Sequence, residues 1–315
     1  MERFRSVNFL PAQRCASVLL IVMTLSVRFA PAGERVKSGE YFVKQSWSQE
    51  KDFQRPYFVS VPSESTKARL PVFVFLHGNG GNGKGAMNGF LRRHCTMARN
   101  YVMVFPDGYL KSWNIVSERS KADDRRFIEA IISRLATCEN VQKNNFTLMG
   151  SSNGAALVNQ LAIESRLPNI RNLITGVSPL NSFQHDGSAF RAKGENNDYQ
   201  KVVTPPAGRR LLNISGTEDR LVPYRGGPSR VIPAKGGKLS FIDAEESTFL
   251  WAKAMGYKGR KLTRPSRIDG RIAVFSYLDG DVVHCRVTGE GHGATHQIGE
   301  ETLLKFLRAG DPAEQ

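Results

Sequence analysis

The sequence predicts one α/β domain in which helices cover both faces of a mostly parallel sheet of about eight strands. Short apolar runs alternate with amphipathic segments, and no internal repeat or low-complexity block interrupts this alternation. The length of 315 residues and the hydrophobic content of 40% suit one large domain with a sizeable core. A serine between two glycines, in the run MGSSNG at 149–154, joins one predicted strand to the helix that follows.

Residues 1–32 differ from the rest of the chain. Arg3, Arg5 and Arg14 precede an apolar run over 15–27. The small residues Ala30-Pro31-Ala32 that follow resemble a signal-peptide cleavage site. This layout predicts a secretory signal peptide, and therefore a secreted or periplasmic protein whose single folded domain spans 33–315. The alternative is an uncleaved anchor, but the apolar run is short for a membrane span, so no stable span is expected after cleavage.

The predicted elements follow from apolar periodicity. Segments 41–47 and 55–61 alternate as antiparallel strands do, and the continuous run PVFVFL at 71–76 suits a strand buried on both faces. The remaining strands are predicted over 101–105, 146–149, 173–177, 211–215, 272–278 and 282–287. The helices are predicted over 87–98, 121–137, 155–164, 244–255 and 300–308. The polar stretch 181–205 is expected to be either a cap over a site or a mobile loop.

Charge and cysteine usage limit the class of protein. The net charge is +15, of which the four Arg and one Glu of residues 1–32 supply +3, so the rest carries +12. Such a surface favours acidic partners, but the basic residues are dispersed without interleaved aromatics, so no nucleic-acid partner is expected. Cys95, Cys138 and Cys285 allow at most one disulfide, and reduced thiols fit equally well. No Cys/His spacing indicates a metal, and no cofactor is expected.

The run Gly150-Ser151-Ser152-Asn153-Gly154 has the Gly-x-Ser-x-Gly pattern of a nucleophile elbow. At so tight a turn, a Cβ at either glycine would collide with neighbouring backbone, and the serine itself adopts a strained conformation. The turn exposes the hydroxyl of Ser152 at the top of the sheet, and the free N–H groups of the following helix favour negative charge there.

A serine nucleophile requires a base and an orienting acid, which follow it in this order in this kind of fold. Asp219 comes directly after the predicted strand 211–215, with Glu218 as its nearest rival. His292 lies between glycines on the loop after the last strand, with His296 as the competing base. The other four histidines, His77, His94, His185 and His284, are expected to be structural or peripheral. Asp123 and Asp124 begin a predicted helix, where capping is the expected role.

The tetrahedral intermediate of acyl transfer carries an oxyanion that needs two backbone N–H donors. One is expected from Asn153, the residue after the nucleophile. The other is expected from the glycine-rich loop after Leu76, at Asn79 or Gly80. That loop lacks the Gly-Lys-Ser/Thr of a phosphate-binding loop.

The segments FLHGNGGNG, FPDGYLKSWN, LMGSSNGAALVNQLA, SGTEDRLVPYRGG and TGEGHG occur in this order. In this the chain resembles the secreted polyhydroxybutyrate depolymerase/feruloyl esterase-like group of α/β-hydrolases, which includes LpqC-like esterases and acetyl xylan esterase relatives. The resemblance spans about 43–307 and implies an α/β-hydrolase fold with the site residues predicted above: Ser152, Asp219 and His292 for catalysis, and Asn79 and Asn153 at the oxyanion. Gly293-Ala294-Thr295-His296 departs from the Trp-Pro that the family usually has after its histidine.

The sequence therefore predicts a secreted serine esterase acting on feruloyl, acetyl or hydroxyalkanoate esters, either small molecules or esterified polysaccharide or polyester. One alternative is a peptidase of the prolyl-oligopeptidase type, although no chain is left over for the propeller domain that such enzymes usually carry. The other alternative is a binding protein that kept the fold without catalysis.

Overall fold

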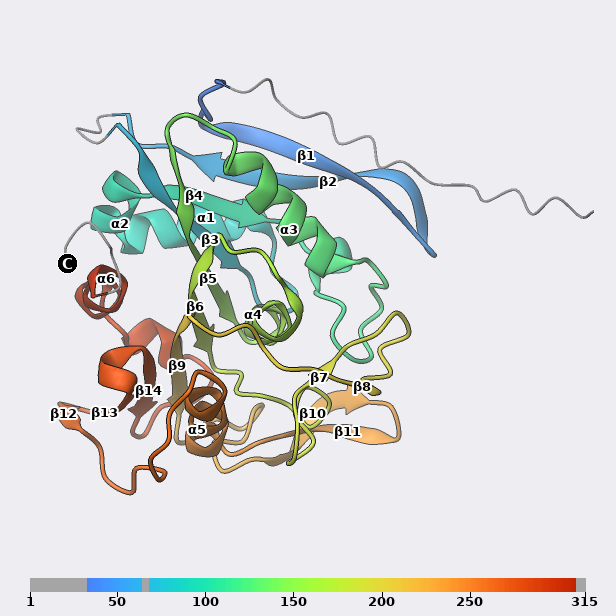
Figure 1. Ribbon diagram of the computed structural model, residues 1–315. Coiled ribbons are helices and arrows are strands. Elements are labelled where there is room, and N and C mark those ends of the chain that lie inside the picture. Colours follow the sequence, from blue (N-terminus) through green and yellow to red (C-terminus); the bar gives the residue numbers. More distant parts are fainter. Residues whose placement is uncertain (1–32, 64–67, 310–315) are drawn as a thin grey trace, which may run out of the picture.

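A twisted sheet runs through the computed structural model, which describes residues 33–63 and 68–309 (Figure 1). The predicted signal peptide lies outside these residues. The sheet has ten strands where about eight were predicted. Their spatial order is β1 (Gly39–Trp47), β2 (Glu50–Ser60), β4 (Val102–Pro106), β3 (Leu70–Leu76), β5 (Val141–Ser151), β6 (Ile170–Gly176), β9 (Arg210–Gly216), β14 (Val282–Val287), β13 (Ile272–Tyr277) and β12 (Arg267–Asp269).

The six central strands, from β4 to β14, are parallel to their neighbours within that set. The outer strands β1 and β2 on one side, and β13 and β12 on the other, pair antiparallel. Because parallel strands end at the same edge, the loops after β3, β5, β9 and β14 emerge together. This edge carries the site described below.

Both faces of the central strands are buried, as the apolar run 71–76 predicted. Val72 and Val74 of β3 belong to one hydrophobic cluster, whereas Phe73 and Phe75 pack with a second cluster on the other face. Helices α3 (Asp124–Leu135), α4 (Asn153–Glu164) and α5 (Ala244–Ala254) cover the first face. Helices α1 (Gly83–Arg93), α2 (Cys95–Asn100) and α6 (Glu300–Arg308) cover the second (Figure 1). The predicted α/β class is confirmed.

Several boundaries differ from the prediction. The helix expected over 87–98 is two helices, α1 and α2, because His94 leaves the helical conformation at φ −123° and ψ 63°. Strand β12 was not predicted, nor was the hairpin of β10 (Gly227–Ala234) and β11 (Gly237–Phe241). The described residues also contain three short 3₁₀ helices: η1 (Tyr109–Lys111), η2 (Leu278–Gly280) and η3 (Ala294–Gln297).

The stretch 181–205 is folded against the domain. It contains the small ribbon of β7 (Arg191–Ala192) and β8 (Lys201–Val202). Tyr199 is buried and its hydroxyl donates to the Ile115 carbonyl at 2.8 Å. The Asn197 amide donates to Asn114 Oδ1 at 2.7 Å. The stretch therefore braces the loop at 112–118, and a role as a cap stays a prediction.

The three cysteines at 95, 138 and 285 are free thiols, with Cys95 exposed and the other two buried. Of the two options that the sequence left open, the structure has the reduced one. Across 33–63 and 68–309, no helix combines the length and apolar character needed to cross a bilayer.

Candidate active site

Ser152 lies at the turn between β5 and α4, with φ 55° and ψ −121°. The glycines on either side of it make this turn possible. An added Cβ at Gly150 would lie 2.3 Å from the Gly154 carbonyl carbon, and one at Gly154 would lie 2.2 Å from the Leu76 carbonyl oxygen. Both approaches are far inside van der Waals contact, so the steric role predicted for the two glycines agrees with the structure.

The three residues predicted to act together form one hydrogen-bonded relay. Ser152 Oγ lies 2.8 Å from His292 Nε2, and His292 Nδ1 lies 2.7 Å from Asp219 Oδ2. A carboxylate only accepts, so Nδ1–H donates to Asp219 and Nε2 is left to accept the Ser152 proton. Asp219 is almost fully buried, with 3% of its side chain exposed, while 26% of the His292 side chain is exposed.

Backbone hydrogen bonds hold the loops of the acid and the base side by side. The Glu218 N–H donates to the Glu290 carbonyl at 2.8 Å, and the Gly289 N–H donates to Thr217 Oγ1 at 2.8 Å. A Cβ at Gly216 would lie 2.3 Å from the Glu290 carbonyl oxygen, so only glycine permits this approach. The position of His292 beside Asp219 is thus set by the backbone.

The two rival residues, His296 for the base and Glu218 for the acid, take no part in the relay. His296 is exposed on η3, and Glu218 is exposed beside the acid; neither hydrogen-bonds to the relay in the described chain. His284 is fully buried between Asn213 and Tyr224, and burial lowers its pKa to about 3.

The carboxylates at the start of α3 have the structural roles that the sequence favoured. Asp123 caps the helix by accepting from the Arg126 N–H. Asp124 does more than cap, because it forms a buried ion pair of 2.6 Å with Arg55 and accepts from the Asn114 N–H.

Two of the backbone N–H groups predicted to bind an oxyanion have no acceptor in the described part of the chain. That of Asn153 begins α4 and has no acceptor within the helix. The glycine-rich loop comes close at Gly78, where an added Cβ would lie 3.6 Å from Ser152 Cβ. Of the two candidate donors on that loop, Gly80 is already bonded to the Lys111 carbonyl at 2.8 Å, whereas no hydrogen bond within the described chain uses the Asn79 N–H. Asn79 is therefore the available donor.

The sequence analysis missed the contacts of the loop at 112–118. Trp113 is fully buried, and its indole N–H donates to the His77 carbonyl at 2.8 Å. The Asn153 side chain hydrogen-bonds to the Trp113 backbone, and Glu118 accepts from the Asn153 amide at 3.0 Å. The segment SWN at 112–114 was noticed only as part of a resemblance, because nothing local reveals partners 36 to 41 residues away.

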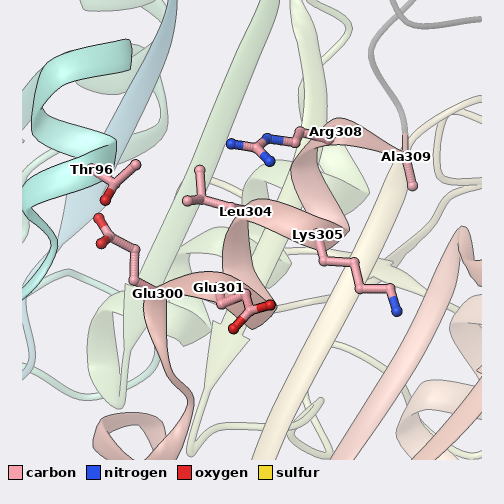
Figure 2. A pocket seen from close by; sticks show the side chains of 7 residues that line it. All are labelled: Thr96, Glu300, Glu301, Leu304, Lys305, Arg308 and Ala309. Atoms are coloured by element: carbon pink, nitrogen blue, oxygen red, sulfur yellow. The ribbon is translucent and has the colours of Figure 1, made fainter.

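Two surface cavities are found among the described residues, and one of them borders the site. One of about 420 Å³ borders the acid and is lined by Glu218, Asp219, Arg220, Pro223, Pro228 and Arg230. A larger one, of about 700 Å³, lies along α6 and contains none of the relay residues (Figure 2). Within the described residues, no group of three or more His, Cys, Asp or Glu side chains is arranged to hold a metal ion.

The parallel sheet, the elbow after β5 and the order of the residues that carry the relay define the α/β-hydrolase fold.

Solved structures with this fold resemble the chain. An acetyl xylan esterase from Aspergillus awamori has a TM-score of 0.56 at 13% identity, over 81% of this chain and 94% of its own. A thermostable esterase has a TM-score of 0.53 at 13% identity, over 86% of this chain and 63% of its own. A complex of a pOPH variant with pNPB has a TM-score of 0.51 at 15% identity, over 91% of this chain and 92% of its own. At these identities the likeness establishes the fold alone. No protein-family model and no curated protein sequence matches the chain.

Proposed function

We propose that the protein is a serine esterase that hydrolyses carboxylic esters through an acyl-enzyme. The observation that carries this proposal is the unbroken relay from Ser152 through His292 to Asp219, with heavy-atom distances of 2.8 and 2.7 Å. A surface serine with no base beside it is a poor nucleophile, and this arrangement supplies both the base and the group that orients it.

In the first half of the reaction, Ser152 Oγ bonds to the ester carbonyl carbon while its proton passes to His292 Nε2. The carbonyl oxygen becomes an oxyanion, which the N–H groups of Asn79 and Asn153 stabilise. The tetrahedral intermediate then collapses, the bond to the alcohol oxygen breaks, and His292 returns the proton to that oxygen. Asp219 stays ionised and stabilises the imidazolium.

In the second half, water attacks the acyl carbon and gives a proton to His292. A second oxyanion forms in the same place and collapses. The free acid leaves and Ser152 Oγ recovers its proton. No cofactor takes part in this scheme.

Replacing Ser152 by Ala tests the proposal. The purified variant and the parent are assayed with p-nitrophenyl acetate and butyrate and labelled with a fluorophosphonate probe. We expect the variant to lose turnover and labelling together. Unchanged turnover would refute the nucleophile assignment, and a parent that neither turns over nor labels would favour the non-catalytic binding protein.

We further propose the substrate class of the group that the sequence resembles: feruloyl, acetyl or hydroxyalkanoate esters. Because the fold is shared with an acetyl xylan esterase, acetylated xylan is included among the substrates to be tested. Methyl ferulate, acetylated xylan and a short hydroxyalkanoate ester are compared by kcat/KM, with a prolyl peptide nitroanilide as the amide control. Faster cleavage of the amide would favour the peptidase alternative.

Export is proposed on the sequence of residues 1–32. Expression of the full chain in a bacterial host, followed by N-terminal sequencing of the exported product, tests this. A new N-terminus near residue 33 is the expected result, and retention of the intact N-terminus would contradict it.

A further inference from the structure

We infer that Trp113 and the side chain of Asn153 are positioning residues that fix the two oxyanion donors relative to each other. This inference rests on the proposed esterase function. It concerns a connection between segments far apart in sequence: the loop after β3, which carries Asn79, and the first turn of α4, which carries the Asn153 N–H.

Trp113 holds the first of these segments. Its side chain is fully buried, and the indole N–H donates to the His77 carbonyl at 2.8 Å. The indole also lies against the His77 ring, with the centroids 4.9 Å apart. His77 stands two residues before Asn79, so Trp113 fixes the end of β3 from which the donor loop begins.

The His77 ring also holds the loop that carries Asn79, through hydrogen bonds of both ring nitrogens. Its Nε2 accepts from the Gly108 N–H at 3.0 Å, so that nitrogen carries no proton. Nδ1 must then be the protonated one, and it donates to the Gly78 carbonyl at 2.8 Å. Burial lowers the pKa of His77, which favours this neutral form. The peptide between Gly78 and Asn79 is thereby held through its carbonyl oxygen, and the same peptide carries the Asn79 N–H.

The backbone of Trp113 holds the second segment. Asn153 Oδ1 accepts from the Trp113 N–H at 2.7 Å, and Asn153 Nδ2 donates to the Trp113 carbonyl at 3.1 Å. The remaining capacity of the amide is used by the Ser112 hydroxyl at 3.3 Å and by Glu118 Oε1 at 3.0 Å. One residue, Trp113, therefore contacts both donor segments, through its indole on one side and through its peptide groups on the other.

Glu118 makes the loop that carries Trp113 rigid. Its second oxygen, Oε2, accepts from the N–H groups of Ile115 at 2.9 Å and Val116 at 2.7 Å. A loop bonded in this way cannot move without breaking several charge-assisted hydrogen bonds. Stabilisation of an oxyanion depends on donors that are already in place, and small displacements of a site cost large factors in rate.

The chain contains a matched control for the indole contact. Trp251 is also buried on α5, and its indole N–H donates to Asn159 Oδ1 at 3.2 Å, in the middle of α4 and beyond the first turn that carries the Asn153 N–H. Trp113→Phe and Trp251→Phe each remove one buried indole N–H and leave one buried oxygen without its donor. Comparison of the two variants separates the effect on the site from the effect on the core.

The experiment measures kcat, KM and thermal unfolding for Trp113→Phe, Trp251→Phe and Asn153→Ala, using p-nitrophenyl butyrate. It also measures the inhibition constant of a trifluoromethyl ketone, which forms a tetrahedral oxyanion with the serine. For Trp113→Phe and Asn153→Ala we expect kcat to fall at least about 10-fold and the inhibitor to bind weaker by a similar factor, with KM changed by less than about 2-fold, because the donors act mainly on the transition state. Trp251→Phe should lower the unfolding temperature comparably but change kcat by less than about 2-fold.

Equal kcat values for the two Trp→Phe variants would overturn the inference, and so would a loss of kcat without weaker inhibitor binding. If Trp113→Phe does not fold, Asn153→Ala decides alone, since it keeps the backbone N–H and removes only the side-chain contacts. Failure of the proposed function is a separate result: in that case the Ser152→Ala variant would keep the turnover of the parent, or the parent itself would show neither turnover nor labelling. An inactive Ser152→Ala beside a fully active Trp113→Phe would reject only the positioning role.

Discussion

Asp219→Asn should abolish most of the activity while leaving the fold intact, because the structure dictates which way the new amide points. Asp219 Oδ1 accepts two backbone N–H groups, those of Leu221 and Val222, each at 2.9 Å. An amide nitrogen in that place would face two donors and leave both unpaired, at a cost of about 1–3 kcal/mol each. The asparagine will therefore keep its oxygen there and turn its NH₂ group toward His292.

The consequence falls on the tautomer of His292. Facing an NH₂ donor, Nδ1 must accept, so the ring proton moves to Nε2 and points at Ser152 Oγ. Nε2 can then no longer take the serine proton. The same change in a serine protease triad costs about 10⁴-fold in kcat, equivalent to about 5.5 kcal/mol of transition-state stabilisation. We expect a loss of that order, with KM little changed.

The assay is steady-state hydrolysis of p-nitrophenyl butyrate together with urea unfolding. Since Oδ1 keeps both N–H bonds, the unfolding free energy should change by less than about 1 kcal/mol. Glu218→Gln is the matched control: it removes the neighbouring, exposed carboxylate and should leave kcat unaffected. An Asp219→Asn enzyme within 10-fold of the parent would refute the reasoning, and a dead Glu218→Gln enzyme would transfer the orienting role to that residue.

Three further predictions concern the scaffold. Asp124→Asn should destabilise the fold by about 3–5 kcal/mol in urea titrations, because it leaves the buried Arg55 guanidinium without its ionised partner. Gly154→Ala should cost more than about 1 kcal/mol and lower kcat sharply, because the new Cβ would overlap the Leu76 carbonyl and displace the start of α4. His284 should make the protein acid-sensitive: its pKa is lowered to about 3 in the fold from 6.5, so the unfolded chain binds a proton that the folded chain excludes. That difference removes stability as the pH falls from about 6.5 to 3, by about 5 kcal/mol in total, and a His284→Asn variant should lose less stability over the same range.

Each of these has a result that would contradict it. If Asp124→Asn lowers the unfolding free energy by less than about 1 kcal/mol, other groups must stabilise the buried charge of Arg55. For the elbow, Gly89→Ala is the control, since nothing lies within 4 Å of its added Cβ and a helical glycine with room for a methyl group gains stability on this change. Equal changes in unfolding free energy and kcat for Gly154→Ala and Gly89→Ala would reject the steric argument. For the acid sensitivity, identical pH profiles of parent and variant would mean that His284 does not contribute.

The sequence predicted the parts of the fold that depend on local pattern. Continuous apolar runs such as 71–76 identified central strands, and the elbow followed from two glycines around Ser152. Chain order after the elbow, together with positions on loops that follow predicted strands, selected His292 and Asp219, which the structure brings within hydrogen-bonding distance. These features are encoded by nearby residues, or by an order that the fold imposes.

Features that depend on distant partners were missed. Strand β12 has only three residues, and each is exposed, so pairing with β13 and not apolar periodicity defines it. The hairpin of β10 and β11 contains Pro228 and Pro233, which weaken a strand pattern. The residues alone left Asn79 and Gly80 both open as oxyanion donors, and only the family resemblance implied Asn79; the physical reason, that the Gly80 N–H is bonded to the Lys111 carbonyl, depends on a distant partner. The break at His94 follows neither a glycine nor a proline, so the sequence carried no signal for it.

The free thiols have a practical consequence for all of these measurements. Because Cys95, Cys138 and Cys285 form no cross-link, no covalent bond between them is needed to reach the native state. Burial raises the pKa of Cys138, and raises that of Cys285 to about 12. Both sulfurs therefore stay protonated, and a protonated thiol is far less reactive than a thiolate. Replacing the exposed Cys95 by Ser should then suffice to prevent adventitious thiol oxidation of the described domain during storage. The variants compared above can be produced in a reducing cytoplasm without concern for mispaired bridges among these three positions.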